Sequence, residues 1–197
     1  MEQPDAVPEV RRAATRPAHR PDGAEELEQL LLRHIRDVPD FPTPGVLFKD
    51  IAPLLADGPA LAAVIGALAE RYAGRVDGVV GIEARGFVLA APLAVALGVG
   101  FVPVRKAGKL PGPTLVGSYA LEYGTASIEV QTDAFRVGQR VVVLDDVLAT
   151  GGTAEAACEL VERAGAQVVE VAVLMELGFL AGRQRLAGRE VHTLVTV

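Results

Sequence analysis

Two adjacent carboxylates followed by small and hydroxyl residues stand out in the segment VVVLDDVLATGGT, residues 141–153. Asp145 and Asp146 come after an apolar run that predicts a buried strand, and the residues beyond the segment predict a helix. The loop between them consists of Ala149, Thr150, Gly151, Gly152 and Thr153. Glycines let backbone N–H groups approach a ligand, and the start of a helix carries a partial positive charge. The loop therefore predicts a cradle for a phosphate monoester.

The two carboxylates restrict which ligand would suit this cradle. They would repel a phosphate, yet they accept hydrogen bonds from sugar hydroxyls, favour a divalent cation and stabilise a carbon that becomes positive. A sugar 5-phosphate that undergoes displacement at C1 presents all three features. The alternative is a capped strand-to-helix turn with two exposed acids. The segment contains neither GxxxxGK[ST] nor GxGxxG, so it does not indicate a P-loop or a dinucleotide fingerprint.

Basic residues in two other segments could bind further anionic groups. Arg85, in GIEARGF, is expected to follow a strand and open a helix, where the surroundings suit an anion. Arg105, Lys106 and Lys109 form a second cluster in RKAGKLPG. The alternatives are an exposed arginine at a helix start and a solvated charge run.

The elements that must position these residues alternate between short apolar runs and helical patterns. Strands are expected at 78–82, 100–104, 140–144, 168–175 and 191–197, with a hairpin formed by 116–121 and 127–131. Helices are expected from 59, from 85 to 97 and from the loop to 164. Continuous Val, Ile and Leu strands that alternate with helices predict an α/β fold, with a central, mostly parallel sheet flanked by helices. Ligands of such sheets bind at the carboxyl ends of the strands.

The N-terminal part of the chain is less regular. We expect residues 1–24 to be a disordered extension, because they are rich in Pro and poor in large apolar side chains. Residues 25–197 are expected to be the catalytic domain, and its first helix should end before Pro39. Residues 41–59 are too rich in Pro and Gly for regular structure, although their apolar side chains should pack against the rest of the domain.

Length and charge exclude several other classes of protein. The chain has 197 residues, of which 50% are hydrophobic, and this suits one well-buried domain. Its net charge of -6 disfavours non-specific binding to nucleic acid or to an anionic membrane. No run is apolar enough for a membrane helix or a signal peptide. Cys158 is the one cysteine and is expected in the core, so we expect a cytoplasmic protein without an internal disulfide.

Five blocks together resemble the type I phosphoribosyltransferase family and, within it, the enzymes that act on adenine. These blocks are residues 41–55, 81–87, 104–114, 118–130 and 141–153. The resemblance covers roughly residues 25–190 in order. It implies that the chain transfers a ribosyl phosphate from phosphoribosyl pyrophosphate to adenine, which gives AMP and pyrophosphate in purine salvage. It also implies a small hood, a mobile hairpin lid, Mg²⁺ and a homodimer.

The resemblance assigns a role to each block. Residues 149–153 would hold the 5-phosphate, while Asp145 and Asp146 would bind the ribose hydroxyls and stabilise the transition state. The metal would be held mainly by substrate and water, and a direct contact from either acid stays open. In relatives the peptide between Glu83 and Ala84 can be cis. The residues expected at the pyrophosphate are Arg85, Arg105, Lys106, Lys109 and Tyr123.

The base and its proton involve a further set of residues. Phe48 and Leu177 would enclose the purine, and backbone groups of Leu47 and Lys49 would bind its edge. Many relatives have Arg at the position of Lys49, but a main-chain contact does not depend on that difference. Glu122 would exchange a proton with N7 of the purine. The alternative for Phe48 and Leu177 is that they are ordinary core residues. The alternative for Glu122 is that it is an acid in a turn without a catalytic role.

Two other functions remain open at this point. One is a phosphoribosyltransferase for another purine base. The other is a non-catalytic regulator of the same fold that senses phosphoribosyl pyrophosphate and binds nucleic acid, which the negative net charge disfavours.

Overall fold

The computed structural model describes residues 22–120 and 125–197. The N-terminal half contains α1 (Asp22–His34), β1 (Arg36–Val38), β2 (Phe48–Asp50), α2 (Ala52–Ala56), α3 (Gly58–Tyr72), β3 (Gly78–Ile82), α4 (Arg85–Leu97) and β4 (Gly100–Lys106). The C-terminal half contains β5 (Thr114–Ala120), β6 (Thr125–Gln131), β7 (Arg140–Leu148), α5 (Gly152–Arg163), β8 (Gln167–Glu176), the 3₁₀ helices η1 (Gly178–Leu180) and η2 (Gly182–Leu186), and β9 (Val191–Thr196).

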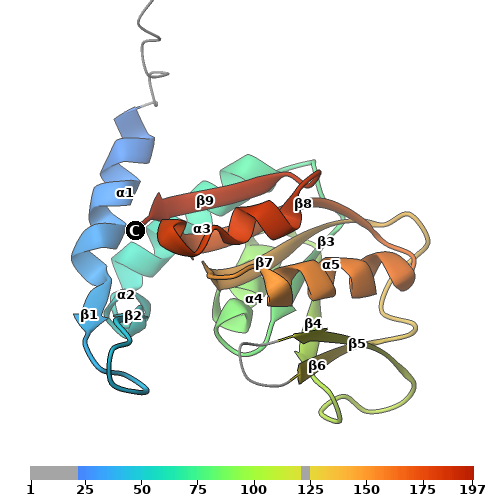
Figure 1. Cartoon of the computed structure of the whole chain (residues 1–197). Coiled ribbons are helices and arrows are strands. Elements are labelled where there is room, and N and C mark those ends of the chain that lie inside the picture. The colour runs from blue at the N-terminus through green and yellow to red at the C-terminus, as the bar shows by residue number, and fades with distance from the viewer. Residues whose placement is uncertain (1–21, 121–124) are drawn as a thin grey trace, which may run out of the picture.

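A seven-stranded sheet in the order β5-β6-β4-β3-β7-β8-β9 forms the centre of the described chain (Figure 1). The strands from β4 to β9 in this order pair in parallel, whereas β5 and β6 pair antiparallel with each other and β6 pairs antiparallel with β4. The predicted α/β fold with a mostly parallel sheet is confirmed. Parallel strands place their carboxyl ends at one edge, where the polar segments of the sequence meet.

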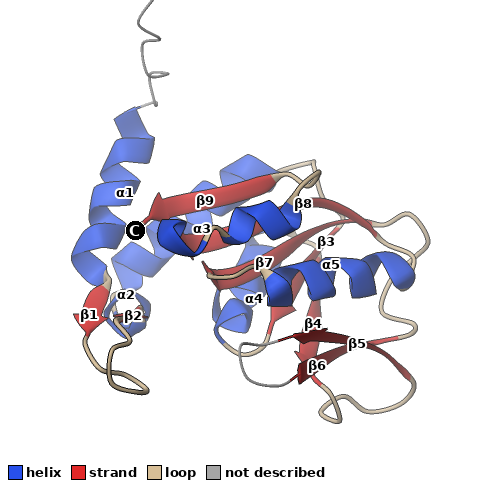
Figure 2. Ribbon diagram, in the orientation of Figure 1, coloured by secondary structure: helices blue, strands red, loops and turns tan. Residues whose placement is uncertain are grey.

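Helices cover both faces of the sheet (Figure 2). Val142 and Leu144 of β7 belong to one buried cluster together with apolar residues of α3 and α4. Val141 and Val143 point the opposite way, into a second cluster with the apolar face of α5. This alternation follows from the two-residue repeat of a strand. Because both faces are buried, the strands are continuously apolar, and Cys158 lies in the second cluster as expected.

Residues 41–59 contain more regular structure than the sequence predicts. They include β2 and α2, and β2 pairs antiparallel with β1. The pairing is supported by an ion pair between Arg36 and Asp50 at 2.5 Å and another between Lys49 and Asp37 at 2.7 Å. These partners lie 12 to 14 residues apart, so a local reading of Pro and Gly content missed them.

The packing expected of the same segment is only partly present. Ile51 is buried, but Phe41, Val46 and Leu47 are each about half exposed. The segment therefore presents apolar side chains to a ligand or to solvent, in addition to the side chain it sends into the core.

Two element boundaries also differ from the prediction. The first helix begins at Asp22, three residues before the expected start of the domain at 25, and it ends at His34, before Pro39 as predicted, because residues 36–38 pair with β2. The strand expected to end at Leu144 continues to Leu148, because its pairing with β8 runs on to Glu176. The two adjacent acids are therefore part of a strand. No helix of residues 22–120 and 125–197 is long and apolar enough to cross a membrane.

Candidate active site

The 149–153 loop connects the end of β7 to the start of α5. Gly151 precedes the helix with a φ of 84°, a left-handed conformation that glycine adopts without strain. A Cβ at this position would lie 2.4 Å from the carbonyl oxygen of Gly182, so no side chain fits. The first N–H groups of a helix have no partner within it. The loop and the start of α5 can therefore offer backbone donors to an anion.

A cavity of about 340 Å³ lies in front of this loop. The residues predicted from the sequence that line it are Arg85, Asp145, Asp146, Ala149, Thr150, Gly151 and Thr153. Gly152 is buried at the start of α5 and does not line the cavity. Glu83 and Ala84, whose peptide the family resemblance singled out, also line it, as does Tyr119, which was not predicted. The structure thus brings together residues that are up to about 70 positions apart in the sequence.

The two acids differ in their surroundings within this cavity. Asp146 is 4% exposed, and its Oδ2 lies 2.8 Å from Nε of Arg85. That oxygen nevertheless accepts no well-aligned hydrogen bond from the described residues. The backbone N–H of Asp146 donates to Oδ1 of Asp145 at 2.9 Å. A buried carboxylate oxygen that lacks a donor is costly and suits a ligand hydroxyl or a cation.

Burial raises the pKa of both carboxyl groups. For Asp145, burial and the neighbouring charge of Asp146 raise the pKa well above its ordinary value. For Asp146, burial raises the pKa, and the Arg85 guanidinium opposes that rise. The ligand-free pair therefore holds negative charge at a cost, and a bound hydroxyl or cation would lower this cost.

The start of α4 packs tightly against the strand that carries the acids. A Cβ on Gly86 would lie 2.7 Å from the carbonyl oxygen of Leu144 and 3.0 Å from Oδ1 of Asp145. The peptide between Glu83 and Ala84 is cis, as the family resemblance implied. The close packing of α4 against β7 places the Arg85 side chain beside Asp146.

The basic cluster at the end of β4 is organised by two acids that sequence reasoning missed. Arg105 donates to Oε1 of Glu83 at 3.2 Å and to the carbonyl of Lys109 at 3.2 Å. Glu129 is 3% exposed and accepts the N–H groups of Lys109 and Leu110, each at 2.7 Å. An acid between Ile128 and Val130 in an apolar strand pattern was a signal for such an anchor.

The side chains of Lys106 and Lys109 themselves are exposed. Neither lines the 340 Å³ cavity. The backbone N–H of Lys106 donates to Oε2 of Glu83 at 2.8 Å, which ties its strand to the cavity wall. The arrangement fixes Lys106 at the end of β4 and Lys109 on the loop that follows, while both side chains stay exposed to solvent.

A second, more apolar cavity of about 270 Å³ is lined by Val38, Phe41, Phe48 and Asp50. Phe41 and Phe48 meet edge to face, with centroids 5.1 Å apart. The Arg85 guanidinium lies 5.2 Å from the centroid of the Phe48 ring, so Arg85 links this cavity to the one with the acids.

The other residues expected at the base do not line this cavity. Leu47 is 51% exposed, and the Lys49 ammonium group pairs with Asp37. Leu177 is half-buried, and its N–H donates to the carbonyl of Leu148 at 2.9 Å, directly before the 149–153 loop. Phe48 and Leu177 are therefore not fully buried core residues. Glu122 and Tyr123 lie outside the described residues.

The residues that could hold a metal ion are limited to oxygen ligands. Within residues 22–120 and 125–197 no group of three or more His, Cys, Asp and Glu could hold a metal ion. Asp145 and Asp146 supply carboxylates, which Mg²⁺ accepts alongside water and substrate phosphates. The Asp146 oxygen that lacks an aligned donor fits such a cation.

Fold and site together define an α/β protein with a glycine-containing loop and two buried acids in one cavity at the carboxyl edge of its sheet. Residues 54–192 match the phosphoribosyl transferase domain, and the chain belongs to this family. Its relatives narrow the class further. The adenine phosphoribosyltransferase of Salinispora tropica is 60% identical over 180 residues, which are 90% of this chain and 95% of that protein.

Solved structures agree with the curated relatives. The adenine phosphoribosyltransferase of Rhodothermus marinus has a TM-score of 0.83 at 52% identity and covers 88% of this chain and 99% of its own. The Saccharomyces cerevisiae enzyme, solved with adenine and an imino-altritol bisphosphate, has a TM-score of 0.83 at 41% identity. It covers 86% of this chain and 99% of its own.

Proposed function

We propose that the chain transfers the 5-phosphoribosyl group of phosphoribosyl pyrophosphate to adenine, giving AMP and pyrophosphate in purine salvage. The observation that carries the proposal is the shared cavity of the 149–153 loop and the two acids, which Arg85 links to the aromatic cavity at Phe48. A sugar phosphate and a planar base must lie side by side for this reaction. Proximity of this kind supplies a large part of the rate acceleration of two-substrate enzymes.

The 149–153 loop would hold the 5-phosphate, and Asp145 and Asp146 would bind the ribose 2- and 3-hydroxyls. As pyrophosphate departs, C1 and the ring oxygen become positive. Two carboxylates fixed beneath the ring stabilise that charge more than they stabilise the neutral sugar, which lowers the barrier. The pKa of each acid, raised by burial, supports this role because the ligand-free pair is poised to gain from a positive neighbour.

Pyrophosphate would lie between Arg85 and the loop shaped by Glu129. Lys106 and Lys109 extend from that loop and can approach a polyanion. Arg105 is held against Glu83, and we propose that it acts at the pyrophosphate directly or across a subunit contact. Bound Mg²⁺ would neutralise the leaving pyrophosphate, and Asp145 or Asp146 can contribute an oxygen ligand to it.

The adenine would lie between Phe48 and Leu177. Backbone groups of Leu47 and Lys49 would bind its edge, where a carbonyl accepts a hydrogen bond from the 6-amino group. A 6-oxopurine would present an acceptor to the same carbonyl and leave it unpaired, which is costly in a buried site. The pairing of the Lys49 side chain with Asp37 is compatible with a main-chain role.

Two parts of the proposal concern residues outside the described ranges. Glu122 would exchange the proton at N7 of the purine, and Tyr123 would close over the pyrophosphate and exclude water. We also propose a homodimer. Val88 and Val95, one helical face of α4, are 43% and 81% exposed, and an apolar helix face beside the site suits a subunit contact. The lone, buried Cys158 supports a reducing, cytoplasmic setting.

A base-competition assay tests the proposed function. The purified chain is incubated with phosphoribosyl pyrophosphate, Mg²⁺ and equal concentrations of adenine, hypoxanthine, guanine and xanthine, and the nucleotides formed are separated. We expect AMP as the dominant product, and omission of Mg²⁺ should abolish turnover. Dominant turnover of a 6-oxopurine would overturn the choice of base. Salt-sensitive binding of duplex DNA without turnover would favour a regulator instead.

A further inference from the structure

Residues 177–182, which follow β8, lie next to the segment that contains the 149–153 loop. Leu177 begins the segment with its hydrogen bond to the carbonyl of Leu148. Gly182 ends it against the same loop, because a Cβ on Gly182 would lie 2.1 Å from the carbonyl oxygen of Ala149 and 3.0 Å from the backbone nitrogen of Gly151. Residues 177–182 are therefore held at one end by the residue directly before the loop and at the other end by the loop itself.

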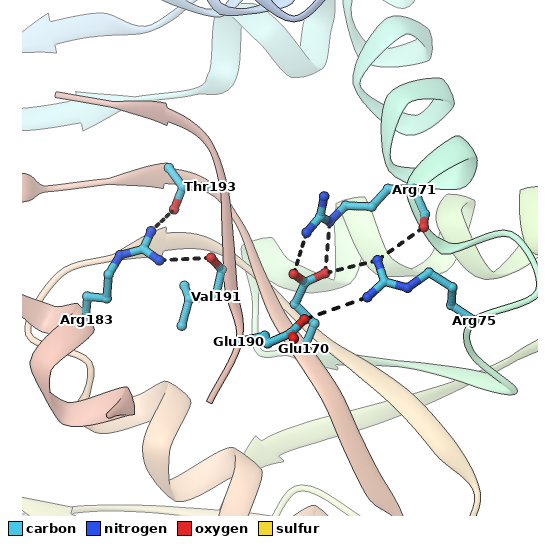
Figure 3. A network of polar contacts seen from close by, with 7 residues as sticks. All are labelled: Arg71, Arg75, Glu170, Arg183, Glu190, Val191 and Thr193. Carbon is cyan, nitrogen blue, oxygen red and sulfur yellow. Dashed lines mark hydrogen bonds and ion pairs between the residues drawn. The ribbon is translucent and has the colours of Figure 1, made fainter. Parts of the chain in front are cut away.

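The residues that flank this segment, Glu176 and Arg183, form an ion pair. Arg183 donates to both carboxylate oxygens of Glu176, through Nε at 3.2 Å and Nη2 at 2.5 Å. Glu176 is 8% exposed and also accepts from Thr193 at 3.1 Å. Arg183 donates further to Thr193 and to the carbonyl of Val191 on β9, as Figure 3 shows. A bidentate guanidinium fixes direction as well as distance.

The backbone between the two partners is held in an uncommon conformation. Ala181 has a φ of 52°, a left-handed conformation that residues with a Cβ seldom adopt. Such a residue keeps this geometry only where its surroundings enforce it. The contacts on either side of Ala181 are Gly182 against the loop and the Glu176–Arg183 pair.

We infer that the Glu176–Arg183 pair is a positioning device for the 149–153 loop, acting through Gly182. Arg183 touches neither acid of the cavity and does not line it. Its effect would reach the ligand through the backbone of Ala149 and Gly151, whose N–H groups must point at the phosphate. The inference rests on the proposed function only for the identity of that ligand, the 5-phosphate of a ribose.

The same strand offers a matched control. Glu170, six residues before Glu176 on β8, is 2% exposed and accepts two hydrogen bonds from Arg71, at 2.9 and 2.5 Å. Figure 3 shows this second pair, which joins β8 to α3 and is supported by Arg75. Arg71→Met therefore removes a comparable buried pair without touching residues 177–182.

Affinity for ribose 5-phosphate, measured by titration calorimetry, tests the inference. We expect Arg183→Met to weaken binding at least about tenfold, Arg183→Lys to weaken it about threefold, and Arg71→Met to change it less than twofold. In turnover, Arg183→Met should raise the KM for phosphoribosyl pyrophosphate about tenfold and the KM for adenine less than threefold. Equal losses in Arg183→Met and Arg71→Met would mean a merely structural role and would overturn the inference.

Hydrogen exchange of the ligand-free protein separates this inference from the proposed function. Amides of residues 149–152 should exchange at least about tenfold faster in Arg183→Met than in the wild type, and at the wild-type rate in Arg71→Met. Unchanged exchange would overturn the positioning role even if the enzyme is active. If the wild type binds no ribose 5-phosphate, the proposed function fails and exchange alone decides. Should Arg183→Met not fold, Gly182→Ala, which keeps the pair but pushes on Ala149, must show the same faster exchange.

Discussion

The two edges of the central sheet carry acidic groups in opposite circumstances. At the amino edge, Asp77 accepts two side-chain hydrogen bonds from Arg140, and the buried Glu170 accepts two from Arg71. At the carboxyl edge, Asp145 and Asp146 lie side by side with one arginine near them. The same chain therefore pairs its charges where they stabilise the fold and leaves them underpaired where a ligand is expected.

This difference extends to the pKa of each group. Burial is the largest single influence and would raise the pKa of Glu170, but the hydrogen bonds and charge of Arg71, together with Tyr72 and His192, outweigh it and lower the pKa. Burial raises the pKa of Asp145, and the charge of Asp146 adds to the rise. A lowered pKa means that the charged form stabilises the fold, and a raised pKa means that it costs stability. The paired acids and the proposed catalytic acids can thus be distinguished by the sign of their contribution to stability.

Replacement of Asp145 by Asn should have the largest effect of any change considered. We expect kcat/KM to fall by about 10² to 10³, because a charge that stabilises the transition state is lost. The same change should raise the Tm, by about 2 to 4 °C for each 1 kcal/mol of relieved burial cost. Steady-state AMP formation and thermal unfolding measure the two effects.

The exposed Asp133 provides the control for the expected loss of activity and gain in Tm, since Asp133→Asn makes the same chemical change on the surface. It should leave both activity and Tm at the wild-type values. If Asp145→Asn lowered the Tm, the carboxylate would be a stabilising group and the contrast between the two edges would fail.

Loss of the guanidinium that pairs with the buried Glu170 should have the next largest effect, now on stability. Arg71→Met leaves a 2% exposed carboxylate whose remaining ion-pair partner is Arg75, 3.8 Å away, with Tyr72 also beside it. Removal of one partner of a buried pair is strongly destabilising, and with Arg75 remaining we expect a loss of about 2 kcal/mol. Urea unfolding measures this loss, while kcat/KM should stay within about twofold. The exposed Arg33→Met serves as the control and should change neither quantity.

A pH titration of stability should reveal opposite signs for the two edges. The pKa of Asp145 is raised, so the folded state binds its proton more tightly than the unfolded state and stability falls as pH rises above 3.8. The pKa of Glu170 is lowered from 4.5, so its contribution is present above that value and is lost as pH falls. Relative to the wild type, Asp145→Asn should therefore gain stability with rising pH, and Glu170→Gln should lose it.

Urea unfolding from pH 2.5 to pH 8 without substrate or Mg²⁺ measures both slopes, because the Glu170 contribution is lost below pH 4.5 and the Asp145 contribution above pH 3.8. Stability differences that do not change with pH in either variant would show that neither acid has a pKa altered by folding. Slopes of the same sign would mean that both carboxylates serve the fold in the same way.

Local patterns in the sequence were sufficient for the elements whose signal is local. The strand at 78–82, the helix at 85–97 and the 149–153 loop were predicted at or near their observed bounds, because apolar periodicity and Gly residues act within a few positions. The acids and Arg85 were predicted as separate segments, and the parallel sheet brings them together. Their joint presence in one cavity follows from the topology.

The features that the sequence did not predict depend on distant partners. The β1–β2 pairing joins residues 12 to 14 positions apart, and Glu129 binds the backbone about 20 positions before it. Position 182 requires glycine because a Cβ there would collide with the backbone of Ala149. The residue type alone does not indicate this contact. Such positions become visible only when the fold fixes which segments touch.

Loss of the ion pair between Asp77 and Arg140 should have the smallest effect on stability, because this pair of the amino edge is exposed. The hydrogen bonds from Arg140 lower the pKa of Asp77 to about 2, yet both side chains are about 40% exposed. Water and salt screen such a pair, and ordering of its side chains offsets much of the attraction. Asp77→Asn should therefore lower the Tm by less than Arg71→Met, and the difference from the wild type should shrink in 1 M NaCl. A loss as large as that of Arg71→Met, and insensitive to salt, would show that geometry outweighs burial at the amino edge.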